Sequence, residues 1–185
     1  MIQSKEDYKE YIEADRVANH ISKRYKGLIF SRLRGGYVFL YLSYMRRIEY
    51  IENCKNGLFW KIVRRLLYQR LYHWSAFTGI TIPPNTFGKG LYIPHWGSIV
   101  VNGNSHFGDN CVVQNGVNVS EEVKGGNHIY LGAGCKLLIG AEIGNDVIVA
   151  ANAVVNKCFK ENNVVLGGIP AKIISEKGFL NRKKI

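Results

Sequence analysis

His95 is the side chain whose surroundings in this sequence best suit acid–base chemistry. It lies in the segment YIPHWGSIVVN, residues 92–102, next to Trp96. A neutral imidazole can accept the proton of a hydroxyl group as that oxygen becomes a nucleophile, and such general-base assistance accelerates a reaction by about 10²–10⁴-fold. Proton transfer to His95 is therefore the first chemical hypothesis, and a structural surface histidine is the alternative interpretation.

The cysteines argue against a zinc or disulfide scaffold. They lie far apart without a Cys-x-x-Cys pair, which suits a reducing compartment, and they are Cys54, Cys111, Cys135 and Cys158. The polar segment Met1–Tyr11 does not resemble a signal peptide. The longest apolar stretch, Gly35–Met45, is too short to span a bilayer. We therefore expect a cytoplasmic protein.

The elements that must position His95 change in character near Gly79. Residues 1–78 carry apolar side chains at helical spacing, over Glu6–His20 and over Leu58–Phe77. The second segment has one predicted apolar face, made of Phe59, Ile62, Val63, Leu66, Leu67 and Leu71. Gly35-Gly36 and Asn56-Gly57 are the expected helix breaks. We expect an N-terminal helical domain whose helices pack together or against a partner subunit.

A six-residue period replaces the helical period after Gly79. Aliphatic or aromatic residues, the anchors, recur at Phe87, Ile93, Ile99, Phe107, Val113, Val119, Leu131, Leu137, Ile143, Val149 and Val155. Four residues after many anchors stands a small or slender residue, namely Cys111, Val117, Cys135, Ala141, Val147 and Ala153. Glycine follows the anchor at positions 88, 108, 132 and 144. So many positions agree in one frame that the repeat is a strong signal.

The repeat predicts a solenoid in which each hexad forms one short strand and one turn. Three hexads close a triangular coil of about 18 residues, with the anchors inside and the small residues at the corners. A hexad is too short for the helix of a βαβ unit. We predict a mainly β fold, a left-handed parallel β-helix over residues 79–174, with a protruding loop at 120–130 and a short basic tail at 175–185.

The positive charge is concentrated in the helical half. The net charge is +11, of which residues 1–75 carry +8. Two interpretations stay open: a solvated helical surface, or attraction to an anionic partner such as a membrane surface or a polyphosphorylated ligand. We expect no nucleic-acid partner, because no recognised nucleic-acid-binding motif accompanies the charge.

The repeat, the histidine of YIPHWGSIVVN and the closing segment GGIPAKII (167–174) resemble the hexapeptide-repeat acyltransferases. The closest branch is the serine acetyltransferase-like group, which includes capsule and O-antigen O-acetyltransferases. The segment EADR (13–16) is similar to a motif in that family's helical domain. The resemblance implies an acetyl-CoA-dependent homotrimer with active sites between subunits.

Carried over by position, the resemblance implies a site for each substrate. His95 matches the catalytic histidine, His128 matches a second active-site histidine, and Asp15 matches an acidic residue that contacts the acceptor or steadies the catalytic histidine. The expected acceptor-binding residues are Asp15, Arg16, Trp96 and Asn127. The expected acetyl-CoA-binding residues are Gly132, Ala133, Gly134, Ala150, Ala151, Lys157, Gly168 and Lys172.

Three departures from that family bear on the acceptor. Ile80 replaces the aspartate that orients the catalytic histidine, so that Asp15 or a backbone carbonyl is left for this task. Pro94 replaces the aspartate before that histidine, and Asn127 replaces the arginine that holds the serine carboxylate. A free amino acid needs partners for both of its charges. We therefore expect a sugar hydroxyl in surface polysaccharide biosynthesis as the acceptor, with serine O-acetylation as the alternative.

Two remoter alternatives remain. Carbonic anhydrases share this solenoid, and His95, His106 and His128 all lie in the repeat. Their spacing does not give two ligands on one strand, and His95 and His106 occupy different hexad positions, so we expect no metal. The other alternative is a non-catalytic trimeric scaffold.

Overall fold

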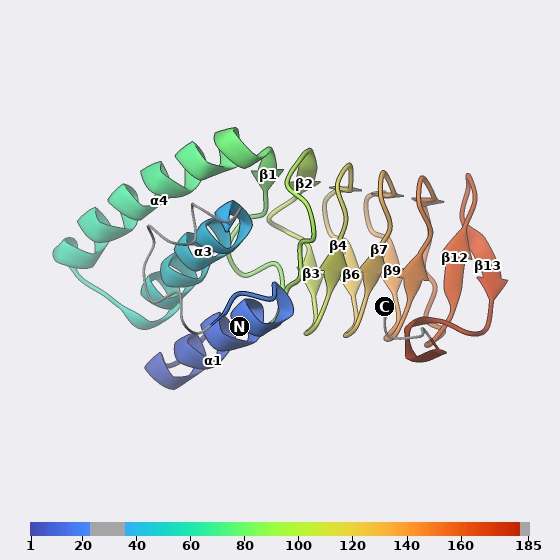
Figure 1. The fold of residues 1–185 in the computed structure, drawn as a ribbon, viewed down its shortest axis with the longest axis horizontal. Coiled ribbons are helices and arrows are strands. Elements are labelled where there is room, and N and C mark those ends of the chain that lie inside the picture. The colour runs from blue at the N-terminus through green and yellow to red at the C-terminus, as the bar shows by residue number, and fades with distance from the viewer. Residues whose placement is uncertain (23–35, 182–185) are drawn as a thin grey trace.

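The helices and the repeat form two parts of an elongated molecule (Figure 1). The structure is a computed structural model of the 185-residue chain and describes residues 1–22 and 36–181. The helices α1 (Lys5–Ala18), α3 (Tyr37–Cys54) and α4 (Leu58–Thr78) lie at one end. The coils stack away from them, and β13 (Lys172–Ser175) lies at the far end.

Local sequence explains where the helices begin and end. The Ser4 hydroxyl accepts a hydrogen bond from the Asp7 N–H at 3.0 Å, which caps the start of α1. Gly36 precedes α3 and Gly57 precedes α4, close to the predicted breaks, whereas Gly35 lies outside the described residues. Gly79 ends α4 with φ +72°. A Cβ at position 79 would lie 2.9 Å from the Gly97 carbonyl oxygen, so this junction requires glycine.

The predicted apolar face of α4 is only partly buried. Leu71 is 4% exposed and packs against α3, together with Trp74 on the same side. Phe59, Ile62 and Leu66 are 67%, 54% and 56% exposed and lie on the opposite side of the helix. The predicted single face is therefore wrong. The helical period fits both sides because α4 is apolar on each of them.

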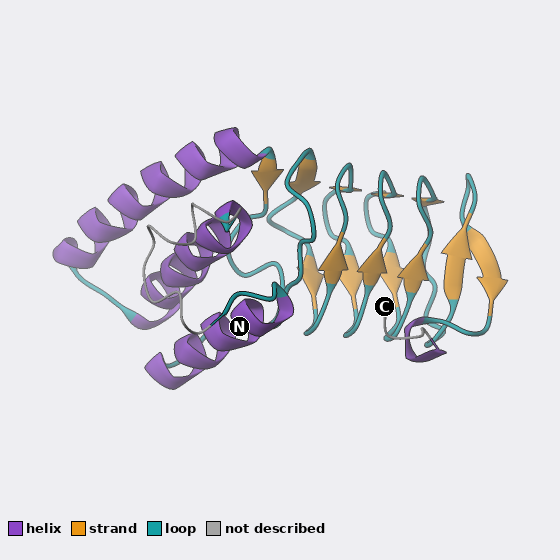
Figure 2. Ribbon diagram, viewed as in Figure 1, coloured by secondary structure: helices purple, strands orange, loops and turns teal. Residues whose placement is uncertain are grey.

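The repeat forms the predicted left-handed parallel β-helix, built from three sheets (Figure 2). The first sheet contains β1 (Ile80–Thr81), β2 (Ile99–Val101), β5 (Asn118–Val119), β8 (Lys136–Leu137) and β11 (Val154–Val155). The second contains β4 (Val112–Val113), β7 (Tyr130–Leu131), β10 (Ile148–Val149), β12 (Val165–Gly167) and β13. The third contains β3 (His106–Phe107), β6 (Lys124–Gly125) and β9 (Glu142–Ile143).

The register of the strands equals one coil. Asn118 pairs with Lys136, and Lys136 pairs with Val154, so each strand lies beside the strand 18 residues further along. The exception is β13, which turns back antiparallel to β12 and ends the second sheet. Beyond it, Phe179–Asn181 form a short 3₁₀ helix, η1, whose Phe179 N–H donates to the Asp146 carbonyl at 2.8 Å. The rest of the predicted basic tail, residues 182–185, lies outside the described residues.

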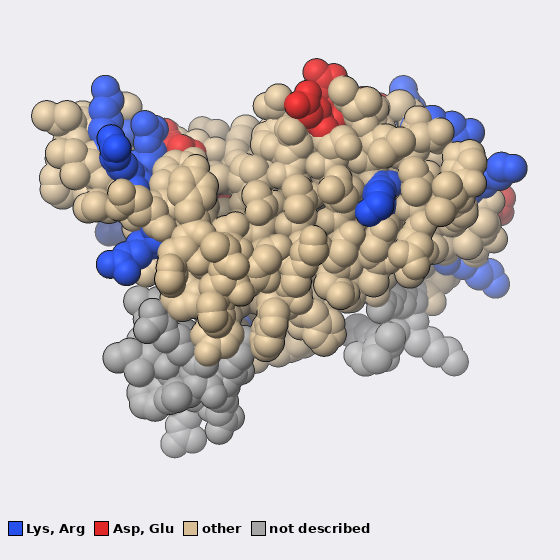
Figure 3. Space-filling model, turned by 90° about the horizontal axis from the view of Figure 1, so that it is seen from above, with Lys and Arg blue, Asp and Glu red and all other residues tan. Residues whose placement is uncertain are grey.

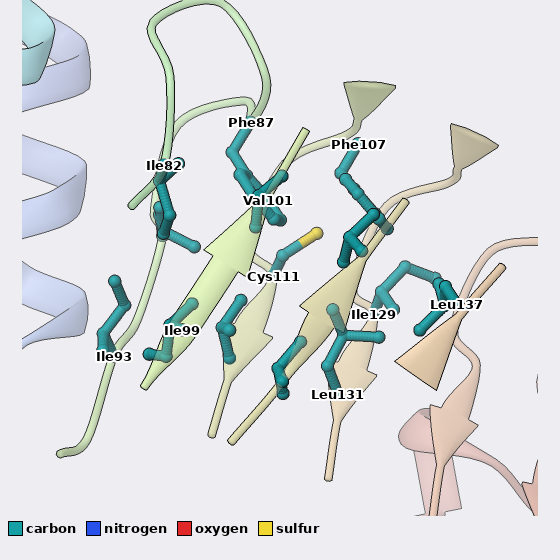
Figure 4. Close-up of a cluster of buried hydrophobic side chains, with 14 of the residues drawn as sticks. Ile82, Phe87, Ile93, Ile99, Val101, Phe107, Cys111, Ile129, Leu131 and Leu137 are labelled. Carbon is teal, nitrogen blue, oxygen red and sulfur yellow. The ribbon is translucent and has the colours of Figure 1, made fainter. Parts of the chain in front are cut away.

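The anchors fill the interior of the coils (Figure 4). Every predicted anchor is at most 6% exposed, and the corner residues, from Cys111 to Ala153, are at most 1% exposed. Burial also raises the pKa of the Cys111 and Cys135 thiols to about 12, so both behave as inert corner residues. The repeat is therefore a continuous apolar core in which each coil buries the faces of its neighbours.

Residues 120–130 do not protrude, which corrects the predicted loop. They form a regular part of the coil, in which β6 pairs with β3 and β9, and Val123 and Ile129 are fully buried. Gly125 stands at the anchor position, and a Cβ there would lie 2.2 Å from the Phe107 ring. That ring stacks on Phe87 at 4.6 Å and occupies the space of the missing anchor.

We expect Gly125→Ala to destabilise the fold by about 1–3 kcal/mol, because the new methyl group overpacks against the Phe107 ring. Gly103→Ala is the matched control, since its Cβ would meet Pro83 at an ordinary 3.5 Å. Combining Gly125→Ala with Phe107→Leu should cost less than the sum of the two single changes in urea unfolding. Strict additivity would contradict this packing.

None of the helices within residues 1–22 and 36–181 is both long and apolar enough to cross a membrane.

Candidate functional site

The β-helix is a triangular prism whose edges are stacks of turns. We call one stack the His95 edge, which consists of residues 94–98, 114–117, 132–135 and 150–153, leading into β2, β5, β8 and β11. Backbone hydrogen bonds join each turn to the one before it. The Gly116 N–H donates to the Ser98 carbonyl at 2.7 Å, the Gly134 N–H to Asn115 at 3.0 Å, and the Asn152 N–H to Ala133 at 2.9 Å. The edge is therefore one continuous, rigid strip.

His95 projects from the first turn of this strip. The anchors on either side of it, Ile93 and Ile99, are 2% and 0% exposed, which fixes both ends of the turn. The His95 side chain is exposed, and no hydrogen bond or ion pair joins its ring to any residue that the structure describes. The ring is thus open to a bound molecule, but within this chain nothing described orients it.

Helix α4 ends directly beside the turn that carries His95. The Gly97 N–H donates to the carbonyl of Thr78, the last residue of α4, at 2.8 Å. Trp96 is 55% exposed and packs edge-on against Tyr37 at 6.1 Å, while Tyr37 also contacts Phe77. The helical domain therefore holds an exposed aromatic surface next to His95.

Most of the predicted acetyl-CoA-binding residues lie on the His95 edge. Gly132, Ala133 and Gly134 form one turn, and Ala150 and Ala151 form the next. A Cβ at Gly132 would lie 2.6 Å from the Val149 carbonyl, so this turn requires glycine. These side chains are too small to cover the backbone, which leaves an open strip along the prism.

The remaining predicted acetyl-CoA residues divide between two places. The Gly168 carbonyl accepts from the Val154 N–H at 3.0 Å, and Lys172 pairs with Gly167, so both lie at the far end of the His95 edge. Lys157 lies on a different edge, in the turn after β11, and its Nζ is 5.2 Å from the Phe159 ring centre. The structure therefore separates Lys157 from the other candidates.

His128 lies on a second edge, the His128 edge, formed by residues 108–111, 126–129 and 144–147. Its Nδ1 is 3.1 Å from the Asp146 carboxylate, and its Nε2 is 3.3 Å from the Asn110 side-chain amide. The His128 ring also stacks on Phe179 at 6.1 Å. Within one chain, His95 and His128 therefore occupy different edges and do not meet.

Sequence reasoning missed the partners of His128. Asn110 and Asp146 stand 18 residues before and after it, which is one coil in each direction, and the three residues share a left-handed φ near +55 to +60°. The 18-residue spacing was the signal that could have identified them. It also explains Asn127, whose side-chain oxygen accepts from the Asp109 N–H at 2.8 Å as one rung of an Asx ladder along this edge.

Asp15 is a packing residue, which corrects its predicted contact with the acceptor or His95. Its side chain is fully buried, and its carboxylate binds the Arg46 guanidinium at 2.8 Å and the Leu91 N–H at 2.9 Å. Arg16 is likewise engaged: it pairs with Glu13 at 2.7 Å and donates to the Ile21 carbonyl. Neither charge is free to bind an acceptor.

Arg46 lies at the centre of a buried charge cluster that joins the helices to the first coil. It pairs with Asp15 of α1 and with Glu49 at 3.0 Å, and it donates to the carbonyls of Phe87 and Gly88 at 2.8 and 2.6 Å. Burial lowers the pKa of the Arg46 guanidinium, but the two carboxylates more than compensate and raise it above its usual range. Burial also raises the pKa of the Glu49 carboxyl, and Arg46 partly offsets this.

Within the two described stretches of the chain, no group of three or more His, Cys, Asp or Glu side chains could hold a metal ion. The three histidines of the repeat therefore do not assemble in this chain. His106 lies in β3, where its Nδ1 is 3.1 Å from the Asn85 carbonyl oxygen.

Solved structures with this architecture define the class of fold. The serine acetyltransferase of Brucella abortus superposes with a TM-score of 0.74 at 22% identity, over 95% of this chain and 72% of that one. A serine acetyltransferase in complex with CoA gives 0.72 at 22% identity, over 93% and 72%. The Neisseria gonorrhoeae serine acetyltransferase in complex with serine gives 0.71 at 19% identity, over 93% and 71%. The chain has the hexapeptide-repeat β-helix fold with an N-terminal helical region.

Sequence comparison narrows the relationship. No family model matches the sequence. A Helicobacter pylori serine acetyltransferase is 33% identical over 108 residues, which are 54% of this chain and 63% of that protein. A Synechococcus elongatus serine acetyltransferase is 29% identical over 137 residues, 68% of this chain and 56% of that protein. The chain spans less than two thirds of the length of these relatives. It is a hexapeptide-repeat protein related to the serine acetyltransferases.

Proposed function

We propose that this protein is an acetyl-CoA-dependent O-acetyltransferase with His95 as its general base. The observation that carries the proposal is an open imidazole at the start of a strip of small-residue turns. Exposed backbone on the turns at 132–134 and 150–151 can bond the pantetheine arm, and Lys172 at the far end can meet a CoA phosphate as a point charge. The thioester supplies the activated acetyl group.

In the proposed reaction, His95 removes the proton from the acceptor hydroxyl as its oxygen attacks the thioester carbonyl carbon. The carbon–sulfur bond then breaks, and the imidazolium returns the proton to the departing CoA sulfur. The N–H groups of Gly97, Gly116 and Gly134 are already donated along the edge. The developing oxyanion must therefore be stabilised by other donors at the site.

The active site is proposed to lie between subunits of a homotrimer. Since His95 and His128 occupy different edges of one prism, they can share a site only when the His128 edge of one subunit faces the His95 edge of another. The pair of His128 and Asp146 would then enter the site already oriented. This arrangement would also supply charged groups that one chain does not bring to His95.

Two acceptors have separate support. Serine is favoured by the comparisons, because the related proteins reported above are serine acetyltransferases. A sugar hydroxyl is favoured by the exposed Trp96 ring beside His95, because an aromatic face suits an apolar sugar face. The burial of Asp15 and the pairing of Arg16 also remove two charges that an amino acid would use. No comparison reported above names a polysaccharide-modifying enzyme.

A CoA-release assay separates these acceptors, comparing L-serine with nucleotide sugars and capsule oligosaccharides. If a sugar is the acceptor, Trp96→Ala should raise the KM for that sugar by up to about tenfold, in line with the roughly 0.5–1.5 kcal/mol of an aromatic contact. The KM for acetyl-CoA should stay unchanged. Tyr72→Ala, an equally exposed aromatic residue on α4, is the matched control.

Turnover with serine alone would assign serine acetylation and remove the sugar proposal. Zinc-dependent turnover would favour a metalloenzyme, and no CoA release with any acceptor would favour a trimeric scaffold.

A further inference from the structure

Helix α4 presents an apolar surface away from the core. Phe59, Ile62, Leu66 and Phe77 follow one another at helical spacing and are 67%, 54%, 56% and 60% exposed. We call these four residues the α4 outer face. Helix α4 contains four basic residues and no acidic one; the basic residues are Lys61, Arg64, Arg65 and Arg70. An apolar stripe flanked by basic residues is the pattern of helices that lie in a membrane interface.

A basic groove adjoins this face. It has a volume of about 610 Å³ and lies between α3 and α4, lined by Tyr44, Arg47, Val63, Leu66, Leu67, Gln69, Arg70 and His73. Leu66 belongs to both the groove and the α4 outer face, so the two are continuous. In the described part of the chain, neither Arg47 nor Arg70 forms an ion pair, and both are exposed. Figure 3, which views this side of the molecule, shows basic side chains gathered at the helical end.

We propose that the α4 outer face and the groove dock the protein on an anionic membrane surface. Phe59, Ile62 and Leu66 enter the boundary between headgroups and acyl chains, while Arg47 and Arg70 bind a lipid phosphate. A second copy of the chain is a poorer occupant. Pairing two identical α4 faces would bring their arginines together, and no carboxylate lines the groove to neutralise them.

Docking in this orientation has a consequence for the site. The last residue of α4 is bonded directly to the turn that carries His95. A membrane-bound α4 would hold that turn near the lipid surface, where a membrane-attached acceptor would be concentrated.

The test is cosedimentation with vesicles of phosphatidylcholine alone or mixed with phosphatidylglycerol, at low and at high ionic strength. We expect binding to the anionic vesicles that weakens as salt is raised. Each basic residue near such a surface contributes a factor of about 5, so Arg47→Gln with Arg70→Gln should weaken binding about 25-fold. Ile62→Asn with Leu66→Asn should weaken it by at least tenfold through lost burial.

Matched controls lie on the β-helix. Lys136→Gln with Lys160→Gln removes two exposed lysines, and Leu138→Asn with Ile139→Asn removes two exposed aliphatic side chains. Both should bind as the wild type does, and circular dichroism should show every variant folded. The proposal is overturned by equal binding to neutral vesicles, by no binding at low ionic strength, or by equal losses in the controls.

A soluble assembly that is lost in Ile62→Asn with Leu66→Asn would assign the face to a second copy and would also overturn the proposal. The assay needs no turnover, so it can fail independently of the proposed acetyltransferase activity.

Discussion

His95→Ala should lower the rate of CoA release by about 10²–10⁴-fold, with little change in the KM for acetyl-CoA. The reason is that the acceptor hydroxyl loses the base that removes its proton during attack, and no other described side chain bonds to that position. Stopped-time assays of free CoA thiol with saturating acetyl-CoA measure the change in kcat. The variant should fold normally, since the His95 ring makes no described hydrogen bond that the fold would lose.

His106→Ala is the matched control for this prediction. His106 is also an exposed histidine of the repeat, but it lies in β3 on a different sheet. Its activity should remain close to that of the wild type. A comparable loss in His106→Ala, or a His95→Ala enzyme with undiminished kcat, would show that His95 is not the base. Loss of activity in His128→Ala would agree with the proposed intersubunit site without replacing this test.

Arg46→Met should destabilise the protein by about 3–5 kcal/mol, because it leaves the carboxylates of Asp15 and Glu49 buried without their cation. It also removes the donors to the Phe87 and Gly88 carbonyls, and with them the link between the helices and the first coil. Urea unfolding followed by circular dichroism measures the loss, at one fixed protein concentration because assembly contributes to apparent stability.

The pH dependence of this variant has a definite sign. Burial already raises the pKa of the Glu49 carboxyl, and removing Arg46 raises it further. A folded-state pKa above the unfolded value means that the folded state binds the proton more tightly. The corresponding stability is present below the unfolded pKa and is lost as pH rises towards the folded pKa. The deficit of Arg46→Met should therefore be smaller at about pH 5 than at about pH 8.

Arg64→Met is the control for the buried cluster. Arg64 and Glu52 form a looser ion pair at 3.9 Å, with side chains 43% and 24% exposed, so its loss should cost less than about 1 kcal/mol. If Arg46→Met cost no more than Arg64→Met, the buried cluster would not hold the two parts of the molecule together.

The fold was predictable because a solenoid repeats one environment. Each anchor meets the same interior space in every coil, so Val113, Leu131 and Val149 all show the same constraint in the sequence. The error at residues 120–130 has the same origin. Gly125 breaks the pattern, and the compensating ring of Phe107 comes from the preceding coil, where a reading of single hexads does not look.

The site was less predictable, because residue type does not reveal the partner. The grouping of His95 with residues 132–134 and 150–151 follows from the repeat frame alone. The burial of Asp15 depends on Arg46, 31 residues away on another helix, and only the folded chain brings the two together. The orientation of His128 by Asp146 lay between these cases, since their separation of one coil was visible but its meaning required the edge.

The stacked turns of the His95 edge also act as a ruler. Neighbouring parallel strands lie about 4.8 Å apart, so the three coil steps from the turn of His95 to the turn of Ala151 span about 14 Å. That length can change only in whole coils of 18 residues. A ligand that reaches from one end of the strip to the other is therefore measured in discrete units, and chain length along the edge becomes a selectivity element independent of any single side chain.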